Sequence, residues 1–489
     1  MNISLKWFWV LCISWCLSLV TAVTFTHLVY AKENSADDYS ALRIFTDVLG
    51  LVQKNYYKEV NVPELVEGAV KGMVMTLDPH SGYLPPDTYK ELQVETKGEF
   101  GGLGIEISVR DGLLTVISPV EDSPAARAGV LAGDQIIKID DEFAKNLSLV
   151  DAVKKMRGPR GTPITLTVHR DGYPDLIPFT IIRDIIKVKS VRSRLLSDNF
   201  GYMRIAQFQE DTFNEYSESI LELKKKNGGK DLRGLVLDLR NNPGGLLTQA
   251  IRVSDIFLKD GIIVYTDGRL ESQKHKYLAR DDRNEPEYPL VVLVNGGSAS
   301  AAEIVSGALQ DAGRALTLGT QTFGKGSVQT IIPMNDNRSA LRLTTALYFT
   351  KSGRSIQAQG VTPDMVVQPK PREIKLEELR DAESLMPREA DLPGAIKNPG
   401  ENGNSEEQKK TKPAKSGAEK TSGADELIIG SRAAIEADLP KLLKEDPQLE
   451  EAIKVLRTWA TSNVKPTLKS DKDKSPAEAS ASAKPVEHK

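Results

Sequence analysis

The sequence predicts an α/β fold, in which buried strands and helices alternate, with a small β-rich module placed before it. Residues 235–239 and 290–294 are near-continuous apolar runs, as expected for strands buried on both faces. The second run precedes a helix, because apolar residues from Ala301 to Ala312 recur at helical spacing. Residues 98–185 instead carry short alternating strands and glycine turns.

The amino-acid composition limits which classes of function are possible for this protein. The 489 residues are 40% hydrophobic and 27% charged, which is ordinary for a soluble globular protein of two or three domains. The formal net charge of −3 argues against a broad nucleic-acid-binding surface.

The first 31 residues are predicted to be a targeting segment. Lys6 precedes an apolar run over residues 7–30, and Val29-Tyr30-Ala31 is typical of an export signal cut after Ala31. The run is also about the ~20 residues that span a bilayer, so an uncleaved inner-membrane anchor is the alternative. Either interpretation places the body of the protein in the periplasm or cell envelope.

Cysteine and histidine are scarce outside this segment. Cys12 and Cys16 both lie within it, which excludes thiol catalysis and disulfides in the mature chain. His80, His169 and His275 form no H-x-x-x-H pair, so a zinc site is not expected. The serine and lysine chemistry described below needs no metal or other cofactor.

The chain before the core divides into two parts. Residues 36–92 are predicted to be a helical region that packs on the core, because residues 42–52 and 65–77 carry apolar residues at helical spacing. In the module at 98–185, strands are expected near 113–117, 135–139 and 164–168, and one helix over 149–156.

The chain after the core changes composition. The core is expected over residues 190–375, and the Gly, Lys, Glu, Ser and Pro content of 385–423 and 463–489 indicates disorder. Residues 424–462 are predicted to form helices whose apolar stripe needs a partner, either the body or another subunit.

Ser300 opens the helix after the second buried strand. With Glu303 three residues later, it fits a capping box, whose role is purely structural. A helix N-terminus also stabilises an oxyanion, and the N–H of Ala301 would face an intermediate formed at the Ser300 oxygen.

Lys325 is the candidate base for this serine. Apolar residues and glycines flank it, and burial would lower its pKa from ~10.4 towards the ~7–8 that a catalytic lysine requires. A lysine in a structural glycine turn is the simpler interpretation. Gly319 to Lys325 also matches the start of a P-loop, although Gly326 stands where that motif has Ser or Thr.

Two glycine turns add backbone donors. Asp238 and Arg240 are expected to support a loop by charge pairing, and the turn after them can aim the Gly244 N–H at the oxyanion. The turn Gly102-Leu103-Gly104-Ile105 can receive a carboxylate, and the strand after it can accept a peptide by strand addition.

Together these blocks resemble the carboxyl-terminal processing, or tail-specific, proteases of the S41 serine peptidase family. The family's N-x-G-S/T-A-S-A-S/A-E pattern matches residues 295–303, with Ser300 rather than Ser298 as nucleophile. Its Y/F-G-K-G pattern matches residues 323–326. The resemblance implies that Lys325 is the base and that Gln329 orients it. Further family patterns match residues 77–84, 238–245 and 359–364.

The module at 98–185 resembles a PDZ domain inserted in a ClpP/crotonase-like protease core. The resemblance implies capture of protein substrates by their exposed apolar C-termini, through residues 102–105, and gating of the protease. A homo-oligomer or an adaptor is expected at the C-terminal helices. A PDZ scaffold with unassembled catalytic residues and a P-loop ATPase are the other hypotheses.

Overall fold

The computed structural model describes residues 39–110, 112–120, 122–281, 287–370, 388–392, 394–398, 446–462 and 464–465. The predicted signal segment and disordered tail after 465, and most of the predicted linker, lie outside the described residues. The chain divides into two compact units, residues 1–77 and 78–489.

The first unit is helical where it is described. Residues 39–55 form a helix, and α2 spans Val62–Met75, as the apolar spacing predicts. Several apolar side chains remain exposed, among them Leu42 at 62% and Val48 at 52%. The packing of this unit on the core stays a prediction.

The core of the second unit is a six-stranded sheet in the order β10-β11-β12-β15-β16-β19. The first pair of strands is antiparallel and the others are parallel. The strands are β10 (Val191–Leu195), β11 (Phe200–Ile205), β12 (Gly234–Asp238), β15 (Leu290–Val294), β16 (Leu316–Gly319) and β19 (Met365–Val366). Each predicted apolar run is therefore a buried central strand.

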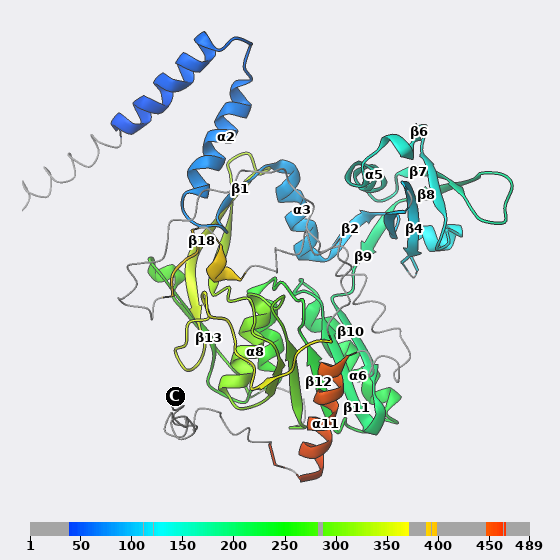
Figure 1. The fold of residues 1–489 in the computed structure, drawn as a ribbon, viewed down its shortest axis with the longest axis vertical. Helices are drawn as coiled ribbons and strands as arrows, with labels where there is room; N and C mark the ends of the chain where they lie inside the picture. Colours follow the sequence, from blue (N-terminus) through cyan, green and yellow to red (C-terminus); the bar gives the residue numbers. More distant parts are fainter. Residues whose placement is uncertain are drawn as a thin grey trace, which may run out of the picture. The chain divides into compact units, whose positions relative to one another are not determined.

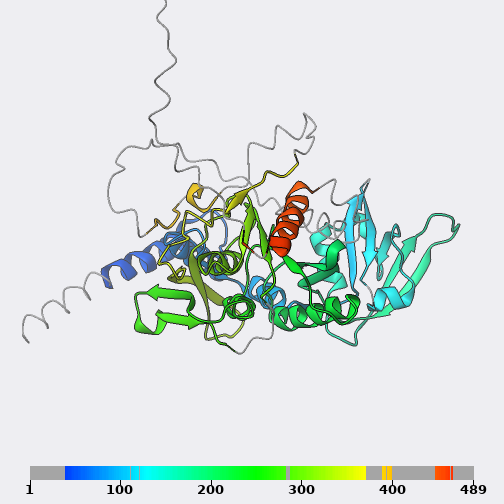
Figure 2. The ribbon, with the colours of Figure 1, turned by 90° about the horizontal axis from the view of Figure 1, so that it is seen from below.

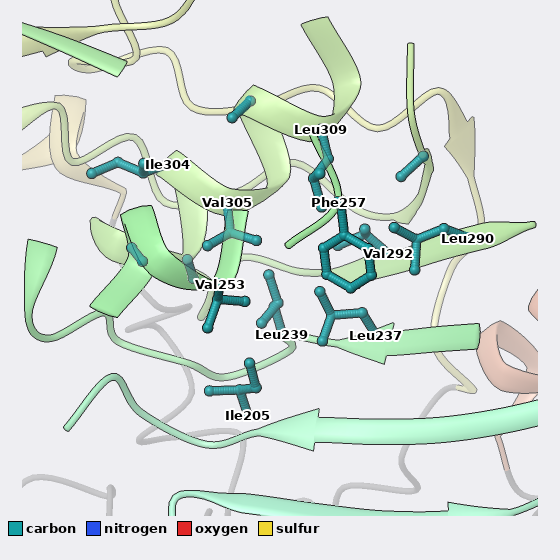
Figure 3. Close-up of a cluster of buried hydrophobic side chains, with 14 of the residues drawn as sticks. Ile205, Leu237, Leu239, Val253, Phe257, Leu290, Val292, Ile304, Val305 and Leu309 are labelled. Atoms are coloured by element: carbon teal, nitrogen blue, oxygen red, sulfur yellow. The ribbon is translucent and has the colours of Figure 1, made fainter. Parts of the chain in front are cut away.

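Helices cover both faces of this sheet. One face packs against α6 (Thr212–Lys226), α7 (Leu247–Asp255) and α8 (Ala301–Asp311). Figure 3 shows side chains of α8, such as Val305 and Leu309, beside Leu239 and Val292 of the sheet side. The opposite face packs against α11 (Pro447–Ser462), the red helix of Figures 1 and 2.

The body of the protein is thus the partner of the predicted C-terminal helical stripe, as far as the described residues extend. The strand side chains alternate between the two faces, because Leu237 lies with α8 while Val236 lies with α11. Residues 424–445 of the predicted helices lie outside the described residues.

A second sheet is antiparallel, and its strand β17 follows directly after the glycine turn around Lys325. Its order is β1-β18-β13-β14, with β17 also paired to β18. The strands are β1 (Gly82–Leu84), β13 (Ile262–Gly268), β14 (His275–Leu278), β17 (Ser327–Pro333) and β18 (Ala340–Phe349). Through β1, the sequence around residues 77–84 becomes part of this sheet, just before α3 (Pro86–Lys97).

The β-rich module has a six-stranded sheet with its own core. Its order is β3-β4-β5-β7-β8, with β6 paired to β5, and β2 pairs separately with β9. The elements are β2 (Glu99–Gly102), β3 (Ile105–Arg110), β4 (Leu113–Pro119), α4 (Pro124–Ala128), β5 (Gln135–Ile139), β6 (Glu142–Phe143), α5 (Leu149–Met156), β7 (Pro163–His169), β8 (Ile177–Ile182) and β9 (Asp184–Lys187). The expectation of one helix is wrong, because Ser123 caps the short additional helix α4.

The predicted disorder from residue 385 begins too early. Residues 389–391 form a short 3-10 turn, and both Glu389 and Asn398 are buried. A buried carboxylate requires partners, so this segment is tied to the core by its polar side chains.

Candidate active site

Three glycine-rich blocks, residues 238–245, 295–303 and 323–329, meet at one edge of the core sheet. Strands β12, β15 and β16 are parallel neighbours, so the loops that follow them leave from the same edge. The Ser298 hydroxyl donates to the carbonyl oxygen of Leu239 at 2.8 Å, and the Phe323 N–H donates to the carbonyl oxygen of Ser298 at 3.0 Å. Ser298 is therefore the junction of the three loops.

An asparagine pair joins the first two loops. The N–H of Asn241 donates to the side-chain oxygen of Asn295 at 2.9 Å, and the Asn295 amide donates back to Asn241 at 2.9 Å. A Cβ at Gly297 would lie 2.6 Å from the Asn241 side-chain oxygen, so this close approach requires glycine.

Ser300 occupies a strained turn between β15 and α8. Its φ of 53° and ψ of −113° are rare for a residue with a side chain. A strained strand-to-helix turn is also how other hydrolases expose a nucleophilic serine. A Cβ at Gly244 would lie 2.8 Å from the Cβ of Ser300, so glycine allows the neighbouring loop to touch the serine.

The two predicted oxyanion donors differ in whether their N–H groups already have an acceptor in this structure. The Ala301 N–H, at the start of α8, has no hydrogen-bond acceptor among the described residues. The Gly244 N–H instead donates to the side-chain oxygen of the buried Asn242 at 2.9 Å. Of these two donors, only the Ala301 N–H is free here, because Asn242 accepts from the Gly244 N–H. The sequence pattern does not reveal this competition.

Glu303 connects the serine and the lysine. One oxygen of its fully buried carboxylate accepts from the Ser300 N–H and from the Lys325 N–H, both at 2.9 Å. The other accepts from the Gly324 N–H at 2.8 Å and from the Thr322 hydroxyl at 2.5 Å. The Glu303 side of the predicted capping box is present, and the same carboxylate also spans two loops.

Burial dominates the ionisation of Glu303. It raises the pKa of this carboxyl to about 7, although the hydrogen bonds from Thr322 and from three backbone N–H groups pull the pKa downwards.

The Lys325 side chain is half-buried. Burial, and then the positive charge of Arg342, lower its pKa, while the carboxyl groups of Glu389, Glu303 and Asp78 oppose the change. Its amine makes no hydrogen bond or ion pair within the described part of the chain. Lysine in an ordinary exposed turn would not be desolvated in this way.

Gln329 lies on β17 and makes no hydrogen bond to the lysine here. Its amide donates to the hydroxyl of Ser327 at 2.9 Å and to that of Thr344 at 3.3 Å. In the described residues, no hydrogen bond joins Ser300, Lys325 and Gln329 side chains to one another. The hydrogen bond by which Gln329 would orient Lys325 is thus not formed in this arrangement.

Tyr348 is a site residue that the motifs did not reveal. Its hydroxyl, buried on β18, lies 3.1 Å from the carbonyl oxygen of Ser300 and also contacts the carbonyl oxygen of Lys325. A lone tyrosine in a strand of mixed polarity gives no sequence signal for such a role.

Asp238 and Arg240 form a buried ion-pair network beside the site. Burial alone would raise the pKa of Asp238, but the charges of Arg240 and Arg204 and the hydrogen bonds from Arg240 lower it to about 2. The Tyr202 hydroxyl donates to the same carboxylate at 2.7 Å. Arg240 also donates to both oxygens of Asp446, at the start of α11. The predicted structural pairing is therefore present, and it extends to the C-terminal helix.

The predicted peptide-binding turn lies at the start of β3, the first strand in its sheet order. The carbonyl oxygens of Leu103 and Gly104 accept from the N–H groups of Ala125 and Val120, which fixes the turn. The N–H groups of Leu103 and Gly104 have no acceptor among the described residues. Gly102 ends β2 and Ile105 begins β3.

The P-loop hypothesis is wrong. A P-loop lysine opens a helix, whereas Lys325 is followed, after Gly326, by the strand β17. In the described part of the chain, no group of three or more His, Cys, Asp or Glu side chains is placed to hold a metal.

Family comparisons agree with the two modules. A model of peptidase family S41 matches residues 199–367, and a PDZ-domain model matches residues 101–178. A model described as the activating protease CtpB N-terminal domain matches residues 17–88.

Similar proteins carry the same family description. The chain is 46% identical to a carboxy-terminal-processing protease of Bartonella bacilliformis, over 87% of this chain and 90% of that protein. It is 37% identical to the carboxy-terminal processing protease CtpA of Bacillus subtilis, over 64% of this chain and 66% of that one. A solved photosystem II D1 C-terminal processing protease matches with 28% identity, 68% and 94% coverage and a TM-score of 0.39.

Proposed function

The chain belongs to the carboxy-terminal processing proteases of peptidase family S41, with a PDZ domain, and within this serine peptidase we propose that Ser300 and Lys325 form the catalytic dyad. The observation that carries the proposal is the shared Glu303 carboxylate, which holds the peptide groups of both residues. It brings a strained serine at a helix N-terminus and a desolvated lysine to one place.

The proposed reaction is acyl transfer to Ser300. The neutral Lys325 amine takes the hydroxyl proton as the Ser300 oxygen attacks the peptide carbonyl carbon. The peptide C–N bond then breaks as the lysine returns its proton to the leaving amine, and water hydrolyses the acyl-enzyme by the reverse sequence of proton transfers.

Two proposed contacts form only when a substrate is present. Ala301 is a ready donor for the oxyanion, whereas the Gly244 N–H must leave Asn242. Gln329 must likewise turn from Ser327 to hold the lysine. Catalytic hydrogen bonds often tighten only in the substrate complex, which is consistent with this arrangement.

Tail recognition is proposed for the PDZ module. The first strand in its sheet order, β3, can pair with an extended peptide, and the N–H groups of Leu103 and Gly104 can receive the terminal carboxylate. Export to the periplasm or envelope is proposed from residues 1–31, with an inner-membrane anchor as the alternative. No helix in the described ranges has the length and apolar character needed to cross a bilayer.

Single substitutions at the dyad test the mechanism. Ser300→Ala and Lys325→Ala should each lower kcat/KM for a protein substrate by more than about 10³-fold, because neither group can replace the other. The exposed Lys351→Ala is the matched control and should retain full activity. Unchanged circular dichroism and unchanged peptide binding by the PDZ domain would show that the variants fold.

Two other outcomes have clear meanings. Full activity of Ser300→Ala would remove the proposed nucleophile. Tight binding of substrate by the wild-type protein, with no products after long incubation, would favour a PDZ scaffold instead.

A further inference from the structure

A segment beyond the residues matched by the peptidase family model contacts the turn at residues 323–326, which is called the lysine turn below. The match ends at residue 367, whereas the described residues 388–392 and 394–398 return to the core. Within this segment Glu389 is fully buried, although an unpaired carboxylate is among the costliest groups to bury. Its partners therefore indicate what it does.

Glu389 has two side-chain partners from distant parts of the chain. The Nε2 atom of His80 lies 2.7 Å and 2.9 Å from its two oxygens. The amide of Gln357, also fully buried, donates to Glu389 at 2.7 Å. His80 belongs to the family pattern at residues 77–84. Its contact with Glu389 therefore positions that pattern beside the lysine turn.

Both ends of the lysine turn are held by these groups. The side-chain oxygen of Gln357 accepts from the Gly326 N–H at 2.9 Å, and the Glu389 N–H donates to the carbonyl oxygen of Phe323 at 3.3 Å. Asn398 of the same segment donates to the backbone oxygen of Gln357 at 2.8 Å. A shift of Glu389 would therefore move the residues on either side of Lys325.

The same carboxylate acts on the lysine amine through space. Of the charged groups facing Lys325, Arg342 lowers its pKa, whereas Glu389, Glu303 and Asp78 raise it. Arg342 itself donates to the backbone oxygen of His80 at 2.8 Å. Removing the charge of Glu389 should therefore favour the neutral amine.

We propose that Glu389 is a positioning residue for Lys325, which fixes the lysine turn through the Gln357 amide and through its own backbone N–H. The proposal rests on Lys325 being the base. It gives a segment outside the family match a part in the reaction, which a purely structural anchor would not have.

Glu389→Gln is the decisive variant, because it keeps the shape of the side chain and removes its charge. We expect the acidic limb of the kcat/KM profile to move to lower pH by about half a unit or more, with KM and melting temperature nearly unchanged. Asp391→Asn removes a carboxylate from the exposed side of the same segment and should leave the profile unchanged.

Glu389→Ala tests whether the Glu389 side chain holds the lysine turn in place through Gln357. Without the Glu389 carboxylate, the Gln357 amide keeps only its 3.2 Å hydrogen bond to the carbonyl oxygen of Ile396. Gln357 should then hold the lysine turn less firmly, and kcat should fall by roughly tenfold to a hundredfold, as expected for a misplaced catalytic group. If this variant does not fold, Glu389→Gln alone decides the question.

The outcomes separate this inference from the dyad. If Ser300→Ala and Lys325→Ala are active, the proposed function itself fails. If both are inactive while Glu389→Gln keeps the wild-type profile and kcat, only the present inference is overturned. A lower melting temperature of Glu389→Gln with an unchanged pH profile would also overturn the inference, since that result assigns Glu389 a structural role.

Discussion

Glu303 sets the geometry of the site at the scale of single residues. A helix cap alone would need only the Ser300 N–H, yet the same carboxylate also accepts from Gly324 and Lys325. Its burial costs free energy whenever it is ionised, and its raised pKa expresses that cost. The protein therefore accepts an unfavourable charge in order to fix two backbone segments.

This cost predicts a pH dependence of stability. The pKa of Glu303 is raised from 4.5 to about 7, so the folded state holds the proton more tightly than the unfolded state. Its contribution to stability is fully present below about pH 4.5 and is lost as the pH rises through about 7, by at most about 3 kcal/mol.

Urea unfolding across this range measures the effect. The free energy of unfolding of the wild-type protein should decline more steeply between pH 4.5 and 7 than that of Glu303→Gln, which cannot ionise. Parallel curves for the two proteins would contradict the raised pKa.

At the scale of elements, α11 completes the core. It adds Leu449, Ile453 and Leu456 to a sheet face that would otherwise be apolar and uncovered, and Asp446 at its start pairs with Arg240 beside the site. A chain ending near residue 380 would lose α11 and Glu389 together. Self-association is therefore better tested in the full-length protein.

Ile453→Ala tests the packing of α11. The side chain is 2% exposed, so its truncation should lower the free energy of unfolding by about 2–5 kcal/mol. Lys454→Ala, on the exposed side of the same helix, should change it by less than about 0.5 kcal/mol. Equal effects of the two substitutions in chemical denaturation would mean that α11 does not pack on the sheet in solution.

The elements show why some features could be predicted and others could not. The apolar runs of β12 and β15 and the periodicity of α8 are local signals, and each matches its predicted range within a residue or two. The contacts of Asn242 with Gly244 and of Glu389 with His80 join residues by tertiary packing, so no spacing reveals them. The residue chemistry predicted that the three glycine blocks could act together, and the family resemblance made that prediction specific.

At the scale of the whole molecule, the peptidase core and the PDZ module have separate hydrophobic cores. In the described residues the lysine amine has no hydrogen-bond partner, and the turn that would receive a carboxylate has free N–H groups. Both the amine and the turn therefore keep unused hydrogen-bonding capacity, and the proposed ligand of the turn is the C-terminal tail of a substrate.

The C-terminal carboxylate of the substrate should then control the rate of cleavage. For two copies of one protein substrate with the same apolar tail, the copy with a free carboxylate should be cleaved with a kcat/KM at least about tenfold higher than the amidated copy. A hydrogen bond to a charged group contributes about 1.5–3 kcal/mol, which corresponds to a factor of ten or more. Steady-state cleavage of both substrates measures this ratio, and a short peptide with no apolar tail serves as the control that bypasses the PDZ module. Equal rates for the free and amidated tails would show that the turn at Leu103 and Gly104 does not read the carboxylate, and would leave the dyad untouched.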